Sequence, residues 1–197
     1  MTRCRTLVLC LLPLLLAVRG EAISIGLSPS PVATSVGGSF SLDLVVAGLG
    51  DGIAPSLGAY DLDVLFDTSL MSLDSVSFGD LLGGAADALQ DAFANGVGSW
   101  NVSELSLLSP SELDALQPAS FVLATLDFTA VAEGTGSVAL GNAIAGDGFG
   151  SPLELQLGAA RVEIGGGAVV PEPGAALLFG LGALAVARAR RRAPAVP

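Results

Sequence analysis

Three aspartates lie close together in one short stretch: Asp61, Asp63 and Asp67. The alternation of residues 60–67 places them on the outward side of an expected strand. Same-face neighbours on a strand are about 6.6 to 7 Å apart, so Asp61 and Asp63 are near enough to share a hard cation such as calcium. Calcium takes six to eight oxygen ligands, and the sequence has no Asp-x-Asp-x-Asp-Gly loop to supply them. A calcium site at Asp61 and Asp63 is one reading, and solvated surface carboxylates are the simpler alternative.

The residue types that the chain lacks exclude most catalysis. It contains no histidine and no lysine, and its two cysteines, Cys4 and Cys10, lie close to the N-terminus. Ser-His-Asp, Cys-His and Schiff-base mechanisms are therefore excluded, and zinc, copper and haem lose their usual ligands. A glycosidase needs two carboxylates about 5 to 10 Å apart across a cleft, and nothing in the sequence singles out such a pair. We expect a protein that is not an enzyme and that needs no cofactor other than a possible calcium ion.

Two aromatic residues are candidates for binding a sugar ring. Trp100 is the only tryptophan and Tyr60 the only tyrosine. Tyr60 falls on the core register of its strand, which favours packing. Trp100 follows a predicted helical insert, so an exposed indole that stacks on a sugar is one possibility and core packing is the other.

The elements that would position these residues are mainly strands. Apolar residues alternate with polar ones in several segments, the pattern of half-buried antiparallel strands. Glycine-rich turns separate the segments, and no βαβ rhythm is present, which favours an all-β sandwich. The expected strands cover residues 39–47, 60–67, 122–130, 137–140 and 161–164.

The alternation also predicts which side chains form the core. On the strand at 122–130, one face would carry Val122, Ala124, Leu126, Phe128 and Ala130. Over the whole domain, the expected core residues are Phe40, Leu42, Leu44, Leu62, Val64, Phe66, Leu126 and Phe128.

Two short helices are expected between the strands. In residues 85–94, Leu89 and Phe93 are four positions apart, as on one face of a helix. Ser109-Pro110-Ser111-Glu112 has the form of a capping box with proline at the first helical position. The second helix should run to about Gln117, because Pro118 stops it.

The C-terminal region combines three features. Pro171, Glu172 and Pro173 precede an apolar run at 174–187, and Arg188, Arg190, Arg191 and Arg192 follow it. A helix of this run would be about 21 Å long, against a bilayer core of about 30 Å, so it is too short for a comfortable permanent anchor. This combination resembles the PEP-CTERM sorting signal of Gram-negative surface proteins. The resemblance implies processing by a membrane protease of the exosortase type close to Pro171–Pro173, with an ordinary tail anchor as the alternative.

The N-terminal region has the features of a secretory signal peptide. Arg3 and Arg5 precede a leucine-rich stretch at 7–18, and Gly20 and Ala22 provide a small-x-small cleavage site. The tail arginines would keep the C-terminus on the cytoplasmic side. We therefore expect an exported protein. The resemblance of its tail to the PEP-CTERM signal implies a Gram-negative bacterium, a transient hold in the inner membrane by the C-terminal helix, and the cell surface or extracellular matrix as destination.

Removing both ends leaves one domain. The sequence predicts a signal peptide at 1–22, a domain at 23–168 and a sorting tail at 169–197. Seventeen of the 19 acidic residues lie in the domain, against a single arginine, Arg161, which gives it a formal charge of −16. Such a surface repels nucleic acid. The mature domain has no cysteine, so its stability must come from packing without disulfides.

The order of motifs along the domain resembles that of a cohesin. The motifs are Ser28–Pro31, Val36–Leu42, Gly58–Leu62, Phe66–Leu70, Asp74–Val76, Leu123–Phe128 and Gly134–Val138. The resemblance implies a jelly-roll sandwich of about nine strands. It also implies association with proteins such as dockerins through one sheet face, or with polysaccharide. The resulting hypothesis is a non-catalytic surface or matrix module, with a carbohydrate-binding module or a purely structural matrix component as alternatives.

Overall fold

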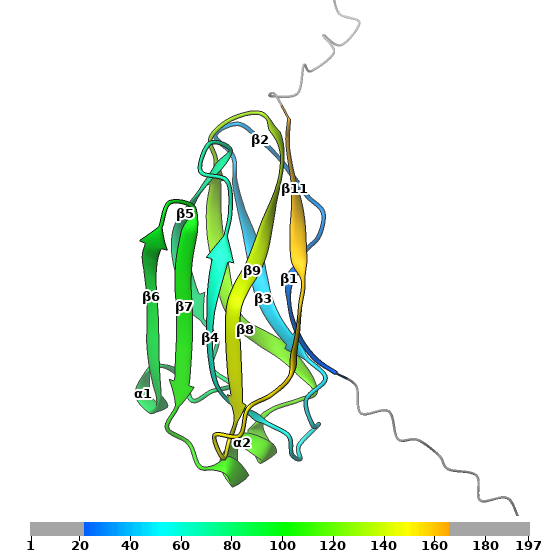
Figure 1. The fold of residues 1–197 in the computed structure, drawn as a ribbon, viewed down its shortest axis with the longest axis vertical. Helices are drawn as coiled ribbons and strands as arrows, with labels where there is room; N and C mark the ends of the chain where they lie inside the picture. The colour runs from blue at the N-terminus through cyan, green and yellow to red at the C-terminus, as the bar shows by residue number, and fades with distance from the viewer. Residues whose placement is uncertain (1–21, 166–197) are drawn as a thin grey trace, which may run out of the picture.

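The computed structural model describes residues 22–165, which form two β-sheets packed face to face with two short helices at one end (Figure 1). Sheet A has the strand order β10-β1-β3-β8-β5, and sheet B has the order β2-β11-β9-β4-β7-β6. The strands are β1 (Ile23–Ser28), β2 (Val32–Ser35), β3 (Ser39–Ala47), β4 (Leu57–Leu65), β5 (Met71–Phe78), β6 (Ala88–Gly96), β7 (Ser99–Ser106), β8 (Ser120–Ala130), β9 (Gly134–Asp147), β10 (Leu155–Leu157) and β11 (Ala159–Gly165). The helices are α1 (Gly84–Asp87) and α2 (Pro110–Leu116). The expected all-β jelly-roll sandwich is confirmed.

The first and last strands each change sheets, which is why eleven strands appear where about nine were expected. β1 belongs to sheet A, and after Pro29 and Pro31 the chain continues as β2 in sheet B. Proline cannot donate to a strand ladder, so this segment breaks the strand. At the other end of the chain, β10 pairs in parallel with β1 and β11 pairs in parallel with β2. The two ends of the domain are thereby bound to each other in both sheets.

The core lies between the sheets and contains the residues predicted from alternation. Leu42, Leu44, Leu62, Val64, Leu126 and Phe128 are fully buried. Phe40 and Phe66 are partly buried and pack against this core. The Phe128 ring is their common partner. It stacks on Phe40 with centroids 5.3 Å apart and meets Phe66 edge to face at 5.4 Å, two geometries that aromatic pairs prefer.

The helix predicted for 85–94 is wrong. Only Gly84–Asp87 forms a helical turn, and Ala88–Gly96 is strand β6 at the edge of sheet B. A spacing of four residues fits a strand as well as a helix, because residues i, i+2 and i+4 share one face of a strand. Leu89 and Phe93 are both exposed on the outer face of β6, and the pairing of β6 with β7 decides the structure.

The predicted face of β8 is correct from Ala124 to Ala130 and wrong at Val122. The register between β3 and β8 shifts at Leu44/Val45, so Leu123 is an extra residue opposite β3. A bulge of this kind reverses the side to which the following residues point. Phe121 and Leu123 are therefore buried, whereas Val122 is exposed.

The second predicted helix is confirmed as α2. The Glu112 carboxylate accepts hydrogen bonds from the Ser109 backbone N–H at 2.9 Å and from its hydroxyl at 2.6 Å. This is the reciprocal arm of a capping box. The helix ends at Leu116, ahead of Pro118.

No helix within residues 22–165 is long and apolar enough to cross a membrane. The expected signal peptide at 1–22, except for its last residue, and the sorting tail at 169–197, including the apolar helix at 174–187, lie outside the described residues. The last described strand, β11, ends at Gly165, and the domain bounds at 23–168 stay a prediction.

Candidate functional site

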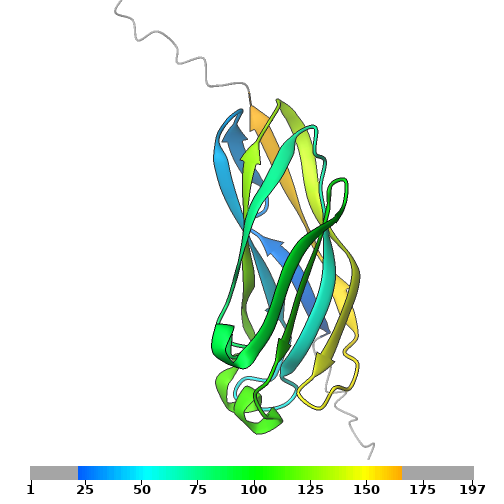
Figure 2. The same cartoon turned by 90° about the vertical axis from the view of Figure 1, so that its left-hand side faces the viewer.

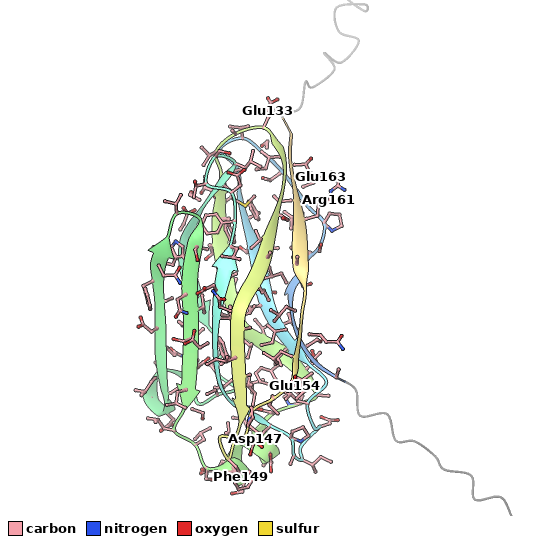
Figure 3. All side chains as sticks on the ribbon, in the orientation of Figure 1. Glu133, Asp147, Phe149, Glu154, Arg161 and Glu163 are labelled. Atoms are coloured by element: carbon pink, nitrogen blue, oxygen red, sulfur yellow. The ribbon has the colours of Figure 1, made fainter. Side chains whose placement is uncertain are left out.

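The outer face of sheet B contains an open groove of about 870 Å³. Strands β9, β4, β7 and β6 form its floor, and the loop after β9 closes one end. This loop includes Phe149 and lies at the end of the sandwich that also carries α1 and α2 (Figures 1 and 3). We call this feature the outer groove.

Strand register explains why the face is hollow. One row across the four strands contains Gly146, Ala59, Leu105 and Leu89, because Ala59 pairs with both Gly146 and Leu105, and Leu105 pairs with Leu89. The two small residues leave space in the middle of the sheet, while the leucines rise on the β6 side. The row therefore forms a floor with one apolar wall.

The next row adds an apolar residue and two acids. Ile144, Asp61, Ser103 and Asp91 lie side by side across the same strands. Leu89, Leu105 and Ile144 are 61%, 48% and 68% exposed. Three large apolar side chains that share a groove and remain this exposed are characteristic of an interaction surface. Asp61 and Asp91 give the groove a negative charge, and none of its lining residues is basic.

A buried carboxylate lies beneath the groove. Glu104, on the inner side of β7, is 2% exposed. Its two oxygens accept hydrogen bonds from the Gln90 amide at 2.8 Å and from the Tyr60 hydroxyl at 3.4 Å. Burial raises the pKa of Glu104, and Asp80 raises it further, while the two hydrogen bonds act in the opposite direction. Burial and the neighbouring Glu104 also raise the pKa of Tyr60.

Of the two candidate calcium residues, Asp61 lines the groove, and Asp63 lies two residues further along the same face of β4, among three asparagines. Asp63 is 7% exposed and accepts hydrogen bonds from the amides of Asn142, Asn95 and Asn101 at 2.6, 2.8 and 3.3 Å. Asn101 also donates to Asp61 at 2.6 Å.

These amides, with Asn142 first, hold the pKa of Asp63 below its usual range. They occupy carboxylate oxygens that a cation would need, so the hydrogen bonds account for the two aspartates without a metal. No cluster of three or more acidic, histidine or cysteine ligands occurs in residues 22–165. Calcium binding at Asp61 and Asp63 stays a prediction.

Trp100 lies on the inner side of β7, in register with the buried Val102 and Glu104, and it pairs with Val64 of β4. Its side chain is half-buried and packs against the core. A ring held in this way presents little of its face for stacking on a sugar. Its role as a sugar platform stays a prediction that the packing does not favour.

The outer face of sheet A is different in chemistry. Its carboxylates are already bonded to neighbouring hydroxyl groups: Asp127 accepts from Ser41 at 2.7 Å and from Ser75 at 2.8 Å, and Asp43 accepts from Thr125 at 2.7 Å. The two serine hydroxyls lower the pKa of Asp127. Because these polar groups already bond to one another, sheet A has fewer free groups for a partner to bind than the apolar groove of sheet B.

The sequence predictions missed the groove and the carboxylate beneath it. The sequence pattern predicts a helix at Leu89 and predicts no strand at Ile144 or Leu105. The signal for Glu104 is visible in retrospect, since Trp100, Val102 and Glu104 alternate on one strand and place an acid on the inner register. The groove itself depends on which strands become neighbours, and alternation within one strand does not carry that information.

The chain matches one family model, the PEP-CTERM protein-sorting motif, over residues 169–192. This range contains Pro171, Glu172 and Pro173 and the four tail arginines. The comparison with curated proteins found no match.

Solved structures of cohesins resemble the sandwich. The non-cellulosomal cohesin of Archaeoglobus fulgidus is 12% identical, with a TM-score of 0.58 over 75% of this chain and 94% of that one. The sixth cohesin of Acetivibrio cellulolyticus scaffoldin B, solved in complex with a Cel5 dockerin mutant, is 17% identical, with a TM-score of 0.59 over 73% and 99%. The cohesin module of a Clostridium perfringens family 33 glycoside hydrolase is 15% identical, with a TM-score of 0.58 over 74% and 96%.

At these identities the likeness concerns the fold. Residues 22–165 form a cohesin-like sandwich, and the same chain carries a PEP-CTERM protein-sorting motif at residues 169–192.

Proposed function

We propose that this protein is an exported, non-catalytic module that binds another protein through the outer groove of sheet B and is sorted through its C-terminal motif. The observation that carries the proposal is the presence of three exposed apolar side chains, Leu89, Leu105 and Ile144, in one groove. The cohesin fold supports it, since a solved relative with this fold is in complex with a dockerin.

The chemistry of the groove defines the partner. An apolar ridge would fill the space above Ala59 and Gly146 and cover the leucine wall. Lysine or arginine side chains on either side of this ridge would approach Asp61 and Asp91. The formal charge of −16 on the domain attracts a basic partner over a longer range and raises its rate of association.

A substitution in the groove tests the proposal. The wild-type protein, Ile144→Glu and the control Val131→Glu are immobilised and exposed to the extracellular fraction of the native host. Val131 is 51% exposed and lies after β8, outside the groove, so it receives the same new charge at another place.

A partner that binds the groove should bind the wild type and Val131→Glu saturably, and Ile144→Glu at least about tenfold more weakly, as expected for a central interface residue. Equal capture by all three proteins would contradict the groove. The absence of saturable binding would favour the purely structural matrix component.

The sorting half of the proposal rests on the motif at 169–192. An exosortase-type protease would recognise Pro171–Pro173 together with the apolar segment and the arginines, and would release the sandwich. The cell surface or extracellular matrix of a Gram-negative bacterium is then the proposed destination. The mass of the processed protein, discussed below, tests this half separately.

A further inference from the structure

The edge of sheet B formed by β6 has the properties of an unoccupied strand-pairing site. β6 is the last strand of the sheet, and within residues 22–165 it pairs with β7 alone. It is the leftmost strand in Figure 1, and its edge faces the viewer in Figure 2.

The other three sheet edges in the described part of the chain are protected. β2 and β10 have four and three residues, too few to offer a long ladder. β5 is longer, but its pairing with β8 shifts between Leu73 and Ser75, leaving Asp74 as an extra residue in its middle. Short strands, bulges and charges are the usual devices that keep sheet edges from pairing.

β6 has these devices only sparsely. Its pairing with β7 is regular from Ala88 to Ala94 and shifts only near the end of the strand, between Ala94 and Gly96. Its one charged residue is Asp91, and it contains no proline or lysine. Leu89 and Phe93 on its outer face are 61% and 48% exposed. A long, regular edge with exposed apolar side chains is a template for another strand.

The hydrogen bonds show which backbone groups are directed outward. The Leu107 N–H donates to the Asp87 carbonyl at 2.8 Å. In an antiparallel ladder this bond makes Ala88 and Ser106 a non-hydrogen-bonded pair. Along the ladder, hydrogen-bonded and non-hydrogen-bonded pairs then alternate, one residue after the other. The N–H and C=O groups of Leu89, Asp91 and Phe93 therefore point to β7, and those of Gln90, Ala92 and Ala94 point away from the sheet.

We propose that β6 binds an extended segment of another protein by antiparallel strand addition, and that this segment has the pattern apolar, basic, apolar at alternate positions. Its backbone would pair with Gln90, Ala92 and Ala94. Its outward side chains would lie beside Leu89, Asp91 and Phe93, so apolar residues at the two ends would contact Leu89 and Phe93, and a lysine or arginine would face Asp91.

The charge of the domain argues for a foreign segment over a second copy. Each copy carries −16. Antiparallel self-pairing centred on Ala92 would set Asp91 of each copy diagonally across from the same residue of the other, about 7 to 8 Å away. A basic segment avoids both the repulsion between the net charges of two copies and the repulsion between their Asp91 side chains. The inference goes beyond the groove, because it uses the backbone of one edge strand instead of a sheet face.

The test uses the labelled peptide Thr-Leu-Thr-Lys-Thr-Leu-Thr and fluorescence anisotropy with the wild-type protein. In the proposed register, the backbone N–H groups of the threonines point to β6, and those of the leucines and the lysine point away. Methylating the nitrogens of two central threonines should weaken binding about tenfold or more, through the loss of two hydrogen bonds. Methylating the nitrogens of both leucines should leave binding unchanged.

Two protein variants extend the test. Ala92→Pro removes an outward N–H that β7 does not use and should weaken binding to the same extent, while Ala92→Ser retains the N–H and should bind normally. Asp91→Lys should bind the peptide that has glutamate in place of lysine about threefold to tenfold better than it binds the original. Circular dichroism checks that Ala92→Pro remains folded, and the methylated peptides keep the test decisive if it does not.

Several results would overturn the proposal: no saturable binding of the peptide, no difference between the two methylated peptides, or loss of peptide binding in Ile144→Glu with no effect of Ala92→Pro. The last result would place the peptide in the groove and would leave the proposed function standing. A dimer in sedimentation experiments that Ala92→Pro dissociates would make the second copy the occupant, and would also overturn it.

Discussion

The side-chain amide of Gln117 pairs with the backbone of Leu57 as a neighbouring strand would. Its Oε1 accepts from the Leu57 N–H at 2.7 Å, and its Nε2 donates to the Leu57 carbonyl at 2.8 Å and to the Leu81 carbonyl at 3.1 Å. Gln117 is 1% exposed and follows α2 directly. One amide therefore connects α2, the start of β4 and the loop before α1.

Replacing this amide should destabilise the domain strongly. Gln117→Leu keeps most of the volume but leaves one N–H and two carbonyl groups without partners, at about 1 to 3 kcal/mol for each buried group. We expect the free energy of unfolding in urea to fall by about 3 kcal/mol or more. Leu116→Ala, on the exposed neighbour, is the control and should cost less than about 1 kcal/mol. Equal losses in the two variants would show that the bonds of Gln117 are not decisive.

Phe128 should be the most sensitive aromatic position. Its ring is fully buried and contacts both Phe40 and Phe66. Phe128→Ala should lower the free energy of unfolding by about 3 to 5 kcal/mol, and Phe66→Ala by less, because Phe66 is only partly buried. Phe149 is 78% exposed, so Phe149→Ala should stay within about 0.5 kcal/mol. Calorimetric melting of the three variants measures these losses. A loss for Phe66→Ala or Phe149→Ala that equals or exceeds that of Phe128→Ala would contradict the prediction.

The shifted pKa values of the carboxyl groups lead us to expect opposite effects of pH on stability, one from Asp63 and Asp127 and the other from Glu104. Hydrogen bonds lower the pKa of Asp63 and of Asp127. Their contribution to the free energy of unfolding is fully present above the unfolded-state pKa of about 3.9. It is lost as pH falls through the lower pKa values of the folded state. Burial raises the pKa of Glu104, so the folded state binds a proton more readily there. Stability then decreases as pH rises from about 4.3, the unfolded value, through the raised folded value.

Glu104→Gln should therefore raise the urea midpoint near pH 7 and change it little near pH 3, where the carboxyl is protonated in both states. The amide can still accept from Gln90 and donate to the Tyr60 oxygen. Glu133→Gln, on the exposed turn before β9, removes the same charge without the burial. If both variants shift the midpoint equally at the two pH values, the effect belongs to net charge and not to the buried site.

Processing at the C-terminal motif predicts a defined mass. The intact protein recovered from its native host should lack the leader and everything after about Pro173. The double variant Pro171→Ala and Pro173→Ala should retain the apolar segment and the arginines, because the protease no longer recognises its site. Glu163→Ala, outside the motif in β11, should be processed normally. Retention of the tail in the wild type would make this segment an ordinary anchor.

The sandwich could be predicted from the sequence where side-chain burial follows simple alternation. β3 has the predicted bounds, Ser39–Ala47, and the buried face of β4 is as predicted. The capping box at Ser109 located α2 because the cap is a local interaction. The misassigned segment 88–96 shows the limit, since Leu89 and Phe93 fit either period and only the pairing of β6 with β7 distinguishes them.

The candidate site was less accessible to prediction, for a physical reason. The groove depends on Ala59, Leu105 and Gly146, which come from three strands and become neighbours only through the register of sheet B. The bonds of Asp63 with Asn95, Asn101 and Asn142 likewise join four separate strand positions. No spacing within one segment encodes such contacts.

β11 ends at Gly165 at one end of the long axis, and the loop after β9, which closes one end of the outer groove, lies at the other end (Figures 1 and 3). β11 is held by β9 on one side and, in parallel, by β2 on the other. Before the protease releases the sandwich, a tension between a partner in the groove and the chain beyond Gly165 would run along these strands. Both ladders would then be loaded in shear, with their hydrogen bonds sharing the force, instead of being peeled apart one bond at a time. The parallel closure of the sandwich thus makes it suited to bear mechanical load.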